Sequence, residues 1–250
     1  VYATARRLES IADLEDKGCK LLALDVTEED SMRAAVKAVE EAEGAVGALV
    51  NNAGYSQSGA VEEVPLDDVR RQFETNVFGL IRMTQLVLPG MRRQRSGRIV
   101  NVGSMGGRLT FPGGGYYHAT KYAVEALSDA LRFEVRGFGI RVALIEPGLI
   151  TTNFGETAVA SVDAAQGDGA YAEFNAAVAA TTASAYEGPL AKFGGGPDTV
   201  AKAIEHAITK RRPKTRYRVT PSARIVIAQR RLMPDRAWDA VMRSQFPQPS

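Results

Sequence analysis

Short apolar runs alternate along the chain with longer segments in which apolar residues recur at helical spacing. The runs KLLALDV and IRVALI are almost continuously apolar, as in strands that are buried on both faces. This pattern predicts strands at residues 1–4, 20–26, 45–50, 97–102, 140–145 and 216–220. The helical spacing predicts helices at residues 8–16, 28–42, 65–88, 116–136, 198–210 and 235–243.

The order of these elements determines the predicted fold class. Strands that alternate with helices form parallel sheets whose two faces are covered by the helices. We therefore expect a single α/β domain over residues 1–250, with a doubly wound, mostly parallel, Rossmann-like sheet. In such sheets ligands bind at the carboxyl ends of the strands. Thr27 and Asp198 are the expected N-caps of the helices that begin beside them.

Residues 151–196 interrupt this alternation. They are rich in Ala, Gly and Thr and contain few large apolar residues. Such a composition is typical of a surface lobe rather than a core layer. We expect a flexible substrate-binding lobe that belongs to the single domain.

Composition and charge narrow the function classes. The chain has 250 residues, of which 45% are hydrophobic and 24% are charged, as in a globular protein. The net charge of +2 gives no general attraction to nucleic acid, and the basic residues at 210–218 are interpreted as a solvated face. The single cysteine allows no internal disulfide, and the two histidines lack partners at metal-binding spacing, so no metal site is expected.

Membrane features are weak in the sequence. No apolar run reaches about 18 residues and no signal-peptide pattern is visible, so we expect a cytoplasmic protein. Apolar residues lie among arginines at 224–236, as in an interfacial helix, but Pro234 interrupts them. Packing of this segment on the body or on another subunit is therefore favoured over membrane association. The long helices also favour a homo-oligomer.

Ser104, Tyr117 and Lys121 carry the strongest chemical signal. Tyr117 and Lys121 are four residues apart on a predicted helix, so their side chains share one face. A nearby ammonium favours the phenolate and so tunes a tyrosine to exchange a proton with a substrate oxygen. Ser104 ends a predicted strand, and its hydroxyl can hydrogen-bond the same oxygen. Alone, this Tyr–Lys spacing is more often a surface pair, so the interpretation depends on the other motifs.

The other motifs occur in a characteristic order. They are LDV at 24–26, NNAG at 51–54, NVFG at 76–79, IVNVGSMGG at 99–107, YHATK at 117–121 and EPGLITT at 146–152. Together they resemble the short-chain dehydrogenase/reductase family over residues 1–152. The GSMGG stretch and the basic C-terminal region are most similar to reductases of the 17β-hydroxysteroid and retinol dehydrogenase type. The resemblance implies an oxidoreductase that moves a hydride between a nicotinamide and a carbonyl or alcohol carbon, in the direction of carbonyl reduction.

The resemblance also implies roles for single residues. Tyr117 would be the general acid/base, Lys121 would also hydrogen-bond the nicotinamide ribose, and Ser104 would orient the substrate carbonyl. Asn76 would hold a water of a proton relay, and its apolar neighbours indicate a buried amide rather than a solvent-facing one. The other residues expected at the cofactor are Asp25 and Val26 at the adenine, Asn51, Ala53 and Gly54 at the floor, and Pro147, Gly148, Ile150 and Thr152 near the nicotinamide.

The residues after the strand at 1–4 indicate which nicotinamide cofactor is bound. An acid there would bind the ribose 2′-hydroxyl of NAD. The position instead holds Ala5, followed by Arg6 and Arg7, and a guanidinium matches a 2′-phosphate in a bidentate fork. NADP is therefore predicted over NAD.

One family feature has no counterpart in the sequence. The family places a strand and a glycine-rich turn, T-G-x-x-x-G-x-G, before the strand at 1–4, and that turn receives the pyrophosphate. We expect this segment to lie upstream of Val1. A polypeptide truly without it would lose a central strand and half of the cofactor floor.

Two functional interpretations follow. The first is an enzyme that acts on a small carbonyl or alcohol molecule. The second is a non-catalytic, cofactor-sensing binding module on the same fold. The presence of all three of Ser104, Tyr117 and Lys121 favours the enzyme, because a sensing module would not need the complete set.

Overall fold

The computed structural model describes residues 1–152, 154–163, 169–187 and 192–249. The strands are β1 (Tyr2–Ala5), β2 (Lys20–Ala23), β3 (Ala48–Asn51), β4 (Gly97–Val102), β5 (Ile140–Glu146) and β6 (Arg216–Arg218). The α-helices are α1 (Glu29–Glu43), α2 (Leu66–Phe73), α3 (Gly79–Arg93), α4 (Gly115–Glu134), α5 (Phe154–Asp163), α6 (Ala172–Glu187), α7 (Pro197–Thr209), α8 (Pro221–Leu232) and α9 (Asp235–Arg243). The 3₁₀ turns are η1 (Leu8–Leu14), η3 (Met105–Gly107) and η4 (Arg136–Phe138), while η2 (Glu74–Phe78) is a π-helical turn between α2 and α3.

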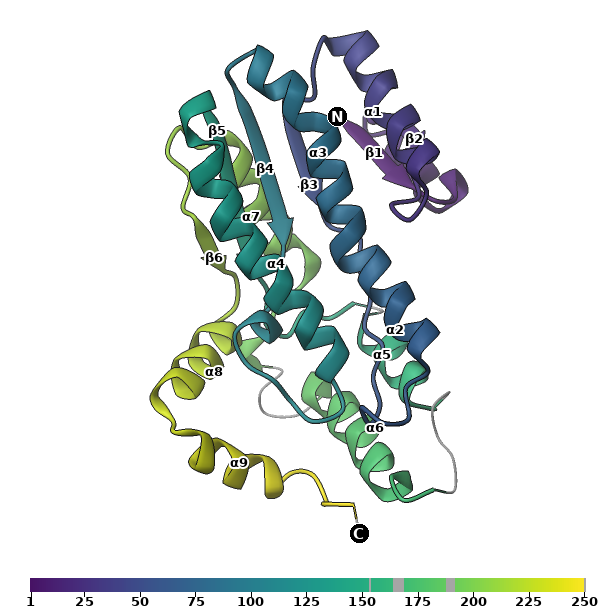
Figure 1. Cartoon of the computed structure of the whole chain (residues 1–250), viewed down its shortest axis with the longest axis vertical. Coiled ribbons are helices and arrows are strands. Elements are labelled where there is room, and N and C mark those ends of the chain that lie inside the picture. Colours follow the sequence, from purple (N-terminus) through teal and green to yellow (C-terminus); the bar gives the residue numbers. More distant parts are fainter. Residues whose placement is uncertain (153, 164–168, 188–191, 250) are drawn as a thin grey trace.

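All strand pairs in the described residues are parallel, and helices cover both faces of the larger sheet. Figure 1 shows α3 and α4 in front of β3, β4 and β5, with α7 behind them. The predicted fold class, a Rossmann-like α/β arrangement, is confirmed. The strands belong to two sheets, with β1 pairing β2 and the order β3-β4-β5-β6 in the other. Within the described part of the chain no ladder joins β1 to β3.

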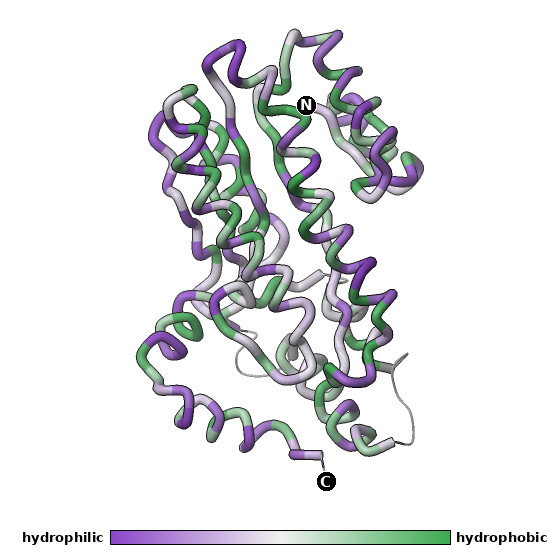
Figure 2. The backbone as a smooth tube through the Cα atoms, in the orientation of Figure 1, coloured by the Kyte–Doolittle hydropathy of each residue, from purple (hydrophilic) through white to green (hydrophobic). Residues whose placement is uncertain are grey.

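The core explains why the strand sequences are apolar throughout. Neighbouring residues of β4 serve opposite faces, since Ile99 packs with α1 and α3 while Val100 packs with α7. Figure 2 shows this as hydrophobic colouring along the central strands and the inner sides of the helices. Strands of this kind place their carboxyl ends together, at the lower end of the sheet in Figure 1.

Three local predictions differ from the structure. Thr27 is not an N-cap, because its hydroxyl and its N–H both donate to Asp25 Oδ1, at 2.7 and 2.9 Å. That turn ends β2 at Ala23, short of the predicted residue 26. Asp198 lies inside α7, and Gly196 is the N-cap residue. Residues 8–14 form a 3₁₀ turn without a buried residue, where a short helix was predicted.

The predicted lobe at 151–196 contains two helices, α5 and α6, although its sequence lacked a clear helical stripe. Residues 153, 164–168 and 188–191 of the lobe lie outside the described residues. Helix α8 was not predicted either. It begins where Thr220 ends β6 early, since Thr220 Oγ1 accepts a hydrogen bond from the Ala223 N–H at 3.2 Å.

The C-terminal helices pack against the body of the protein, as the sequence favoured. Ile227, Trp238 and Phe246 are buried in one apolar cluster with Leu109 and Val178. None of the helices in the described residues has the length and apolar character needed to cross a bilayer.

Candidate active site

Ser104, Tyr117 and Lys121 line one cavity of about 1020 Å³ at the carboxyl ends of β3, β4 and β5. They are separated by up to 17 residues in sequence, yet the parallel strand β4 and the following helix α4 bring them to the same wall. The structure therefore brings these three residues together in one place. Helices α5, α6, α7 and α8 and the segment after α9 form much of the remaining wall.

The turn after β4 is shaped by its glycines. Ser104 is the N-cap of η3, and its Oγ accepts a hydrogen bond from the Gly106 N–H at 3.0 Å. A Cβ on Gly106 would lie 2.6 Å from His118 Nδ1, and one on Gly107 would lie 2.8 Å from the Lys121 carbonyl oxygen. Glycine is thus required for α4 to pack closely on this turn. The close packing holds Ser104 beside the first turns of α4.

Lys121 is buried and its ammonium is held in place. Its Nζ donates to the Val102 carbonyl oxygen at 3.0 Å and lies 5.7 Å from the centroid of the Tyr117 ring. Burial lowers the pKa of Lys121 to about 8, from 10.5 for a free side chain. The ammonium stays positive at neutral pH, and a positive charge beside a phenol favours the phenolate.

The Tyr117 ring is oriented by two aromatic neighbours. Its centroid lies 5.5 Å from that of Phe154 on α5 and 5.7 Å from that of His118. His118 is itself held by Gly106, whose carbonyl oxygen lies 2.9 Å from Nδ1. The lobe helix α5 therefore contributes a wall directly against the predicted acid/base residue.

Asn76 lies in the π-helical turn η2 and is buried, as its apolar neighbours predicted. Its Oδ1 accepts from the Tyr55 N–H at 3.0 Å, and its Nδ2 donates to the Tyr55 carbonyl oxygen at 2.9 Å and to Thr120 Oγ1 at 3.1 Å. A Cβ on Gly54 would lie 3.1 Å from Asn76 Oδ1. Asn76 thus clamps the chain after β3 to α4, one turn from Tyr117.

Besides Tyr117 and Lys121, which were also predicted to contact the cofactor, five predicted cofactor residues line the same cavity: Gly54, Pro147, Gly148, Ile150 and Thr152. Gly148 must be glycine, because a Cβ there would collide with the Ser222 hydroxyl at the start of α8. Ile150 forms an isolated parallel bridge with Gly195 through the backbone groups of its neighbours. The N–H and C=O groups of Ile150 itself take no part in this bridge and therefore point away from Gly195.

The other predicted cofactor residues do not line the cavity. Asn51 Nδ2 donates to Asn101 Oδ1 at 2.9 Å, so its side chain belongs to a polar chain beneath α3 and α4. The next residue, Asn52, lines the cavity instead. Ala53 is exposed. The sequence placed all of NNAG in the floor, and strand alternation separates its members.

The residues predicted for the adenosine end lie at the carboxyl ends of β1 and β2. Arg6 and Arg7 follow β1 and are exposed. The backbone N–H of Thr27 lowers the pKa of Asp25, and the nearby Arg6 lowers it further. Val26 packs against Gly79, where a Cβ would lie 2.6 Å from the Val26 carbonyl oxygen. Arg6 and Asp25 are thus near one another, beside the β1–β2 sheet, whereas Tyr117 lies on helix α4.

A buried group of charges lies behind the cavity and was not predicted. Glu146 ends β5 fully buried and pairs with Arg218 at 3.2 Å, while Glu125 of α4 pairs with Arg216 at 2.9 Å. Burial, and next the neighbouring Glu146, raise the pKa of Glu125 to about 7. These pairs join α4, β5 and β6 just before Pro147. From the sequence only the basic members, Arg216 and Arg218, were noted, as part of the basic run at 210–218.

His118 and Phe154 also line the cavity and were missed as site residues. His118 could have been found, because it follows Tyr117 within YHATK, but a histidine at that spacing has no distinctive signal. Phe154 could not, because its position depends on how the lobe folds over α4. No group of three or more His, Cys, Asp or Glu residues in the described ranges is arranged to hold a metal ion.

Comparisons with known proteins agree with this geometry. The family pattern described as short chain dehydrogenase matches residues 2–163. The oxidoreductase YusZ of Bacillus subtilis is 34% identical over 256 residues, which cover 98% of this chain and 89% of the relative. A short-chain dehydrogenase from Streptomyces avermitilis superposes with a TM-score of 0.76 at 32% identity, covering 98% of this chain and 88% of that one. A serine dehydrogenase complexed with NADP⁺ superposes with a TM-score of 0.74 at 28% identity, covering 88% and 84%.

Proposed function

Because the chain belongs to the short-chain dehydrogenase/reductase family and is an oxidoreductase, we propose that it reduces a carbonyl group with NADPH, using Tyr117 as the general acid. The observation that carries the proposal is the position of Ser104, Tyr117 and Lys121 on one wall of one cavity. An ordinary surface pair of tyrosine and lysine would be solvated, whereas Lys121 is 7% exposed.

Each side chain has a task that its surroundings allow. When bound, the nicotinamide cofactor supplies the hydride. Tyr117 donates a proton to the substrate oxygen, which takes on negative charge as the carbonyl is reduced. Ser104 donates a hydrogen bond to that oxygen through its hydroxyl proton, because its Oγ already accepts from Gly106. Lys121 stabilises the phenolate that remains, and Asn76 keeps the Gly54–Tyr55 segment against α4.

The residues present fit the nicotinamide half of the cofactor. Gly54, Gly148 and Ile150 offer backbone at the cavity wall, and a Cβ at either glycine would meet neighbouring atoms. For the adenosine half, Arg6 lies beside Asp25 at the end of β1, where a guanidinium suits a 2′-phosphate better than a hydroxyl. This arrangement supports NADP over NAD.

The proposed cofactor preference has a direct test. In the Arg6→Gln/Arg7→Gln variant, we expect the ratio of kcat/KM with NADPH to that with NADH to fall at least about tenfold, as for the loss of a charge-assisted hydrogen bond. Activity with NADH should change little, because its ribose carries no phosphate. An unchanged ratio would show that these arginines do not select the cofactor.

The cavity walls indicate the substrate class. Beyond Tyr117 the lining is mainly apolar and includes Met105, Phe111, Val178 and Phe246. Lys121 is the one charged side chain among the described lining residues. A substrate charge would lose its hydration there without a partner. We therefore expect an uncharged, largely apolar ketone or aldehyde.

The catalytic role of Tyr117 is tested by the Tyr117→Phe variant, with a panel of apolar ketones and aldehydes as substrates. Turnover should fall by about 100-fold or more, in line with the loss of a general acid, while NADPH fluorescence titration shows unchanged binding. Full turnover by the variant would refute the role. If the wild-type protein binds NADPH but reduces no member of a broad panel, the cofactor-sensing module is the better interpretation.

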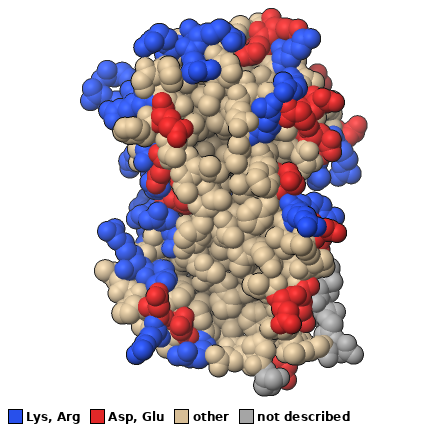
Figure 3. Space-filling model, viewed as in Figure 1, with Lys and Arg blue, Asp and Glu red and all other residues tan. Residues whose placement is uncertain are grey.

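Self-association stays a prediction. Figure 3 shows a broad band without charge colouring that runs down the face over α3 and α4, between charged groups at both sides. Tyr122 of α4 and Phe78 of η2 are large side chains that are about half exposed, at 45% and 51%. Long helices with apolar exposed residues favour an interface between two copies on this face.

A further inference from the structure

A second cavity lies at the opposite end of the sheet from the candidate active site. It has a volume of about 570 Å³, and strand β5 begins in its wall, whereas the same strand ends at the active-site cavity. Its lining residues come from the end of α4, from η4, from the start of β5 and from the loop before β6. They are Arg132, Phe133, Arg136, Ile140, Arg141, Val142, Arg212, Pro213 and Thr215.

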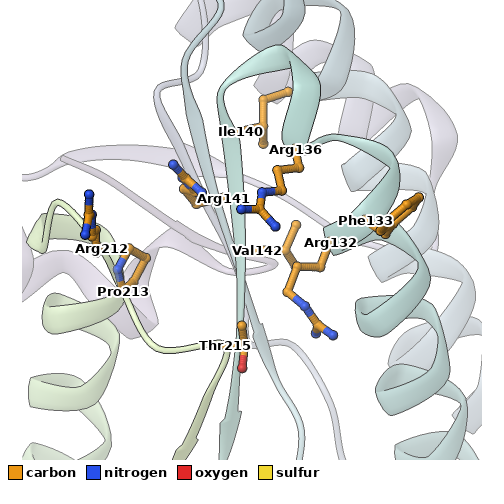
Figure 4. A pocket seen from close by; sticks show the side chains of 9 residues that line it. All are labelled: Arg132, Phe133, Arg136, Ile140, Arg141, Val142, Arg212, Pro213 and Thr215. Carbon is orange, nitrogen blue, oxygen red and sulfur yellow. The ribbon is translucent and has the colours of Figure 1, made fainter.

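Four arginines surround this cavity, which we name the arginine pocket. Figure 4 shows Arg132 and Arg136 on the α4 side, Arg212 on the loop at the other side, and Arg141 on β5 between them. Arg132 pairs with Asp129. No ion pair joins Arg136, Arg141 or Arg212 to an acid within the described residues. Three positive charges therefore lie around the pocket without an acidic partner in the described residues.

The floor of the arginine pocket is apolar. Ile140 and Val142 are buried in it, at 1% and 5% exposure. Arg136, Arg141 and Arg212 are exposed above this floor, so their charges are accessible to a ligand from solvent. Like charges gathered over such a surface repel one another, and an anion bound among them would relieve that repulsion.

The geometry and the charge together indicate the chemistry of the ligand. A guanidinium presents paired N–H donors that match the oxygens of a phosphate group. The three uncompensated arginines stand on three different elements around a cavity of about 570 Å³, which has room for more than a single phosphate group. Cavities of about 300–1000 Å³ are usual for small-molecule sites. We propose that the arginine pocket binds an anion with two or more phosphate groups, at a site separate from the cofactor.

The structure also explains why this site could not be predicted from the sequence. Arg212 belongs to the basic run at 210–218, which looked like a solvated face. Arg136 and Arg141 lie some 70 residues earlier, on either side of the Gly139 turn. Only the parallel pairing of β5 with β6 brings the two segments together.

The test uses the whole protein and inorganic pyrophosphate as the probe. Isothermal titration calorimetry should show pyrophosphate binding to the wild type that weakens with added salt. Binding should weaken at least about tenfold in Arg136→Gln/Arg141→Gln, because two charge-assisted contacts are lost. Arg212→Gln, in an exposed loop, provides a second variant that does not alter the sheet. Arg231→Gln, an exposed arginine of α8, is the matched control and should bind as the wild type does.

Two further arms separate the possible sources of the phosphates. The Arg6→Gln/Arg7→Gln variant should keep its pyrophosphate affinity, which distinguishes the arginine pocket from the proposed cofactor site. Co-sedimentation with phosphatidylcholine vesicles, with and without phosphatidylinositol bisphosphate, detects a lipid headgroup as the source. Binding to pyrophosphate alone, or to both probes, supports the site if the pocket variants abolish it. Equal binding by wild type and both pocket variants, or binding to neither probe, overturns the proposal.

Discussion

Lys121 offers the sharpest test of the proposed active site, because its burial opposes stability while its charge serves the chemistry. Lys121 is 7% exposed, and the hydrogen bond from its ammonium to the Val102 carbonyl oxygen replaces only part of the hydration of that group. The substitution Lys121→Met keeps much of the volume and removes the charge. We expect this variant to be more stable than the wild type at pH 7 and to lose activity.

The size of the effect follows from the pKa of Lys121. Burial lowers it from 10.5 to about 8, which corresponds to about 3 kcal/mol of differential interaction. Loss of the bond to Val102 offsets about 1 kcal/mol, so the net gain at pH 7 is about 2 kcal/mol. Between pH 8 and 10.5 the unfolded chain keeps a proton that the folded protein has released. The stability of the wild type therefore rises with pH across that window, and the advantage of the variant shrinks.

Urea unfolding of both proteins at pH 7 and pH 10 measures this difference directly. Comparison within each pH removes the titration of groups that the two proteins share. Lys202→Met is the matched control, since Lys202 is an exposed lysine on α7 and its replacement removes no buried charge. The reasoning fails if Lys121→Met is less stable than the wild type at pH 7, or if its advantage is the same at both pH values.

Two further predictions concern one residue that lines the cavity and one that lies behind it. Gly148→Ala should lower the free energy of unfolding by about 2 kcal/mol, because its Cβ would collide with the hydroxyls of Thr220 and Ser222. Gly47→Ala is the control and should change the free energy of unfolding little, because a Cβ at Gly47 meets no atom within 4 Å. Equal urea midpoints for the two variants would contradict the packing argument. Glu125→Gln should gain stability relative to the wild type between pH 5 and pH 8. In the folded protein Glu125 keeps its proton up to about pH 7, whereas in the unfolded chain it loses the proton near pH 4.5, so the stability of the wild type falls between these two pH values. Thermal unfolding of both proteins at pH 5 and pH 8 measures the difference in stability. A difference that is the same at both pH values would be inconsistent with a raised pKa of Glu125.

The local sequence pattern was sufficient to predict a structural feature where that feature depends on a single helix or strand. Residues 97–102 form β4 and residues 235–243 form α9, as the periodicity predicted. Tyr117 and Lys121 share a helix face because helical geometry requires it. Burial of Asn76 followed from its apolar neighbours, and the structure adds that the amide is satisfied by Tyr55 and Thr120.

Local pattern failed where an outcome depends on the partner of a residue. Thr27 had the composition of an N-cap, but the Asp25 carboxylate competes for its hydroxyl. Asn51 and Asn52 are the same residue type in neighbouring positions, so the sequence does not distinguish them. Because side chains alternate along the chain at the end of β3, Asn51 lies beneath the helices and Asn52 lines the cavity. Helices α5 and α6 had little helical stripe to detect, because alanine occupies exposed positions, such as Ala160 and Ala176, as well as buried ones, such as Ala158.

The sequence by itself determined the fold class, the family and the three residues proposed for proton transfer, because strand and helix periodicity and the short motifs are local properties of the chain. Only the tertiary structure decided that Phe154 packs against Tyr117 and that arginines from distant segments surround one cavity. Contacts of that kind arise from the pairing and packing of elements far apart in sequence, and no spacing along the chain records them.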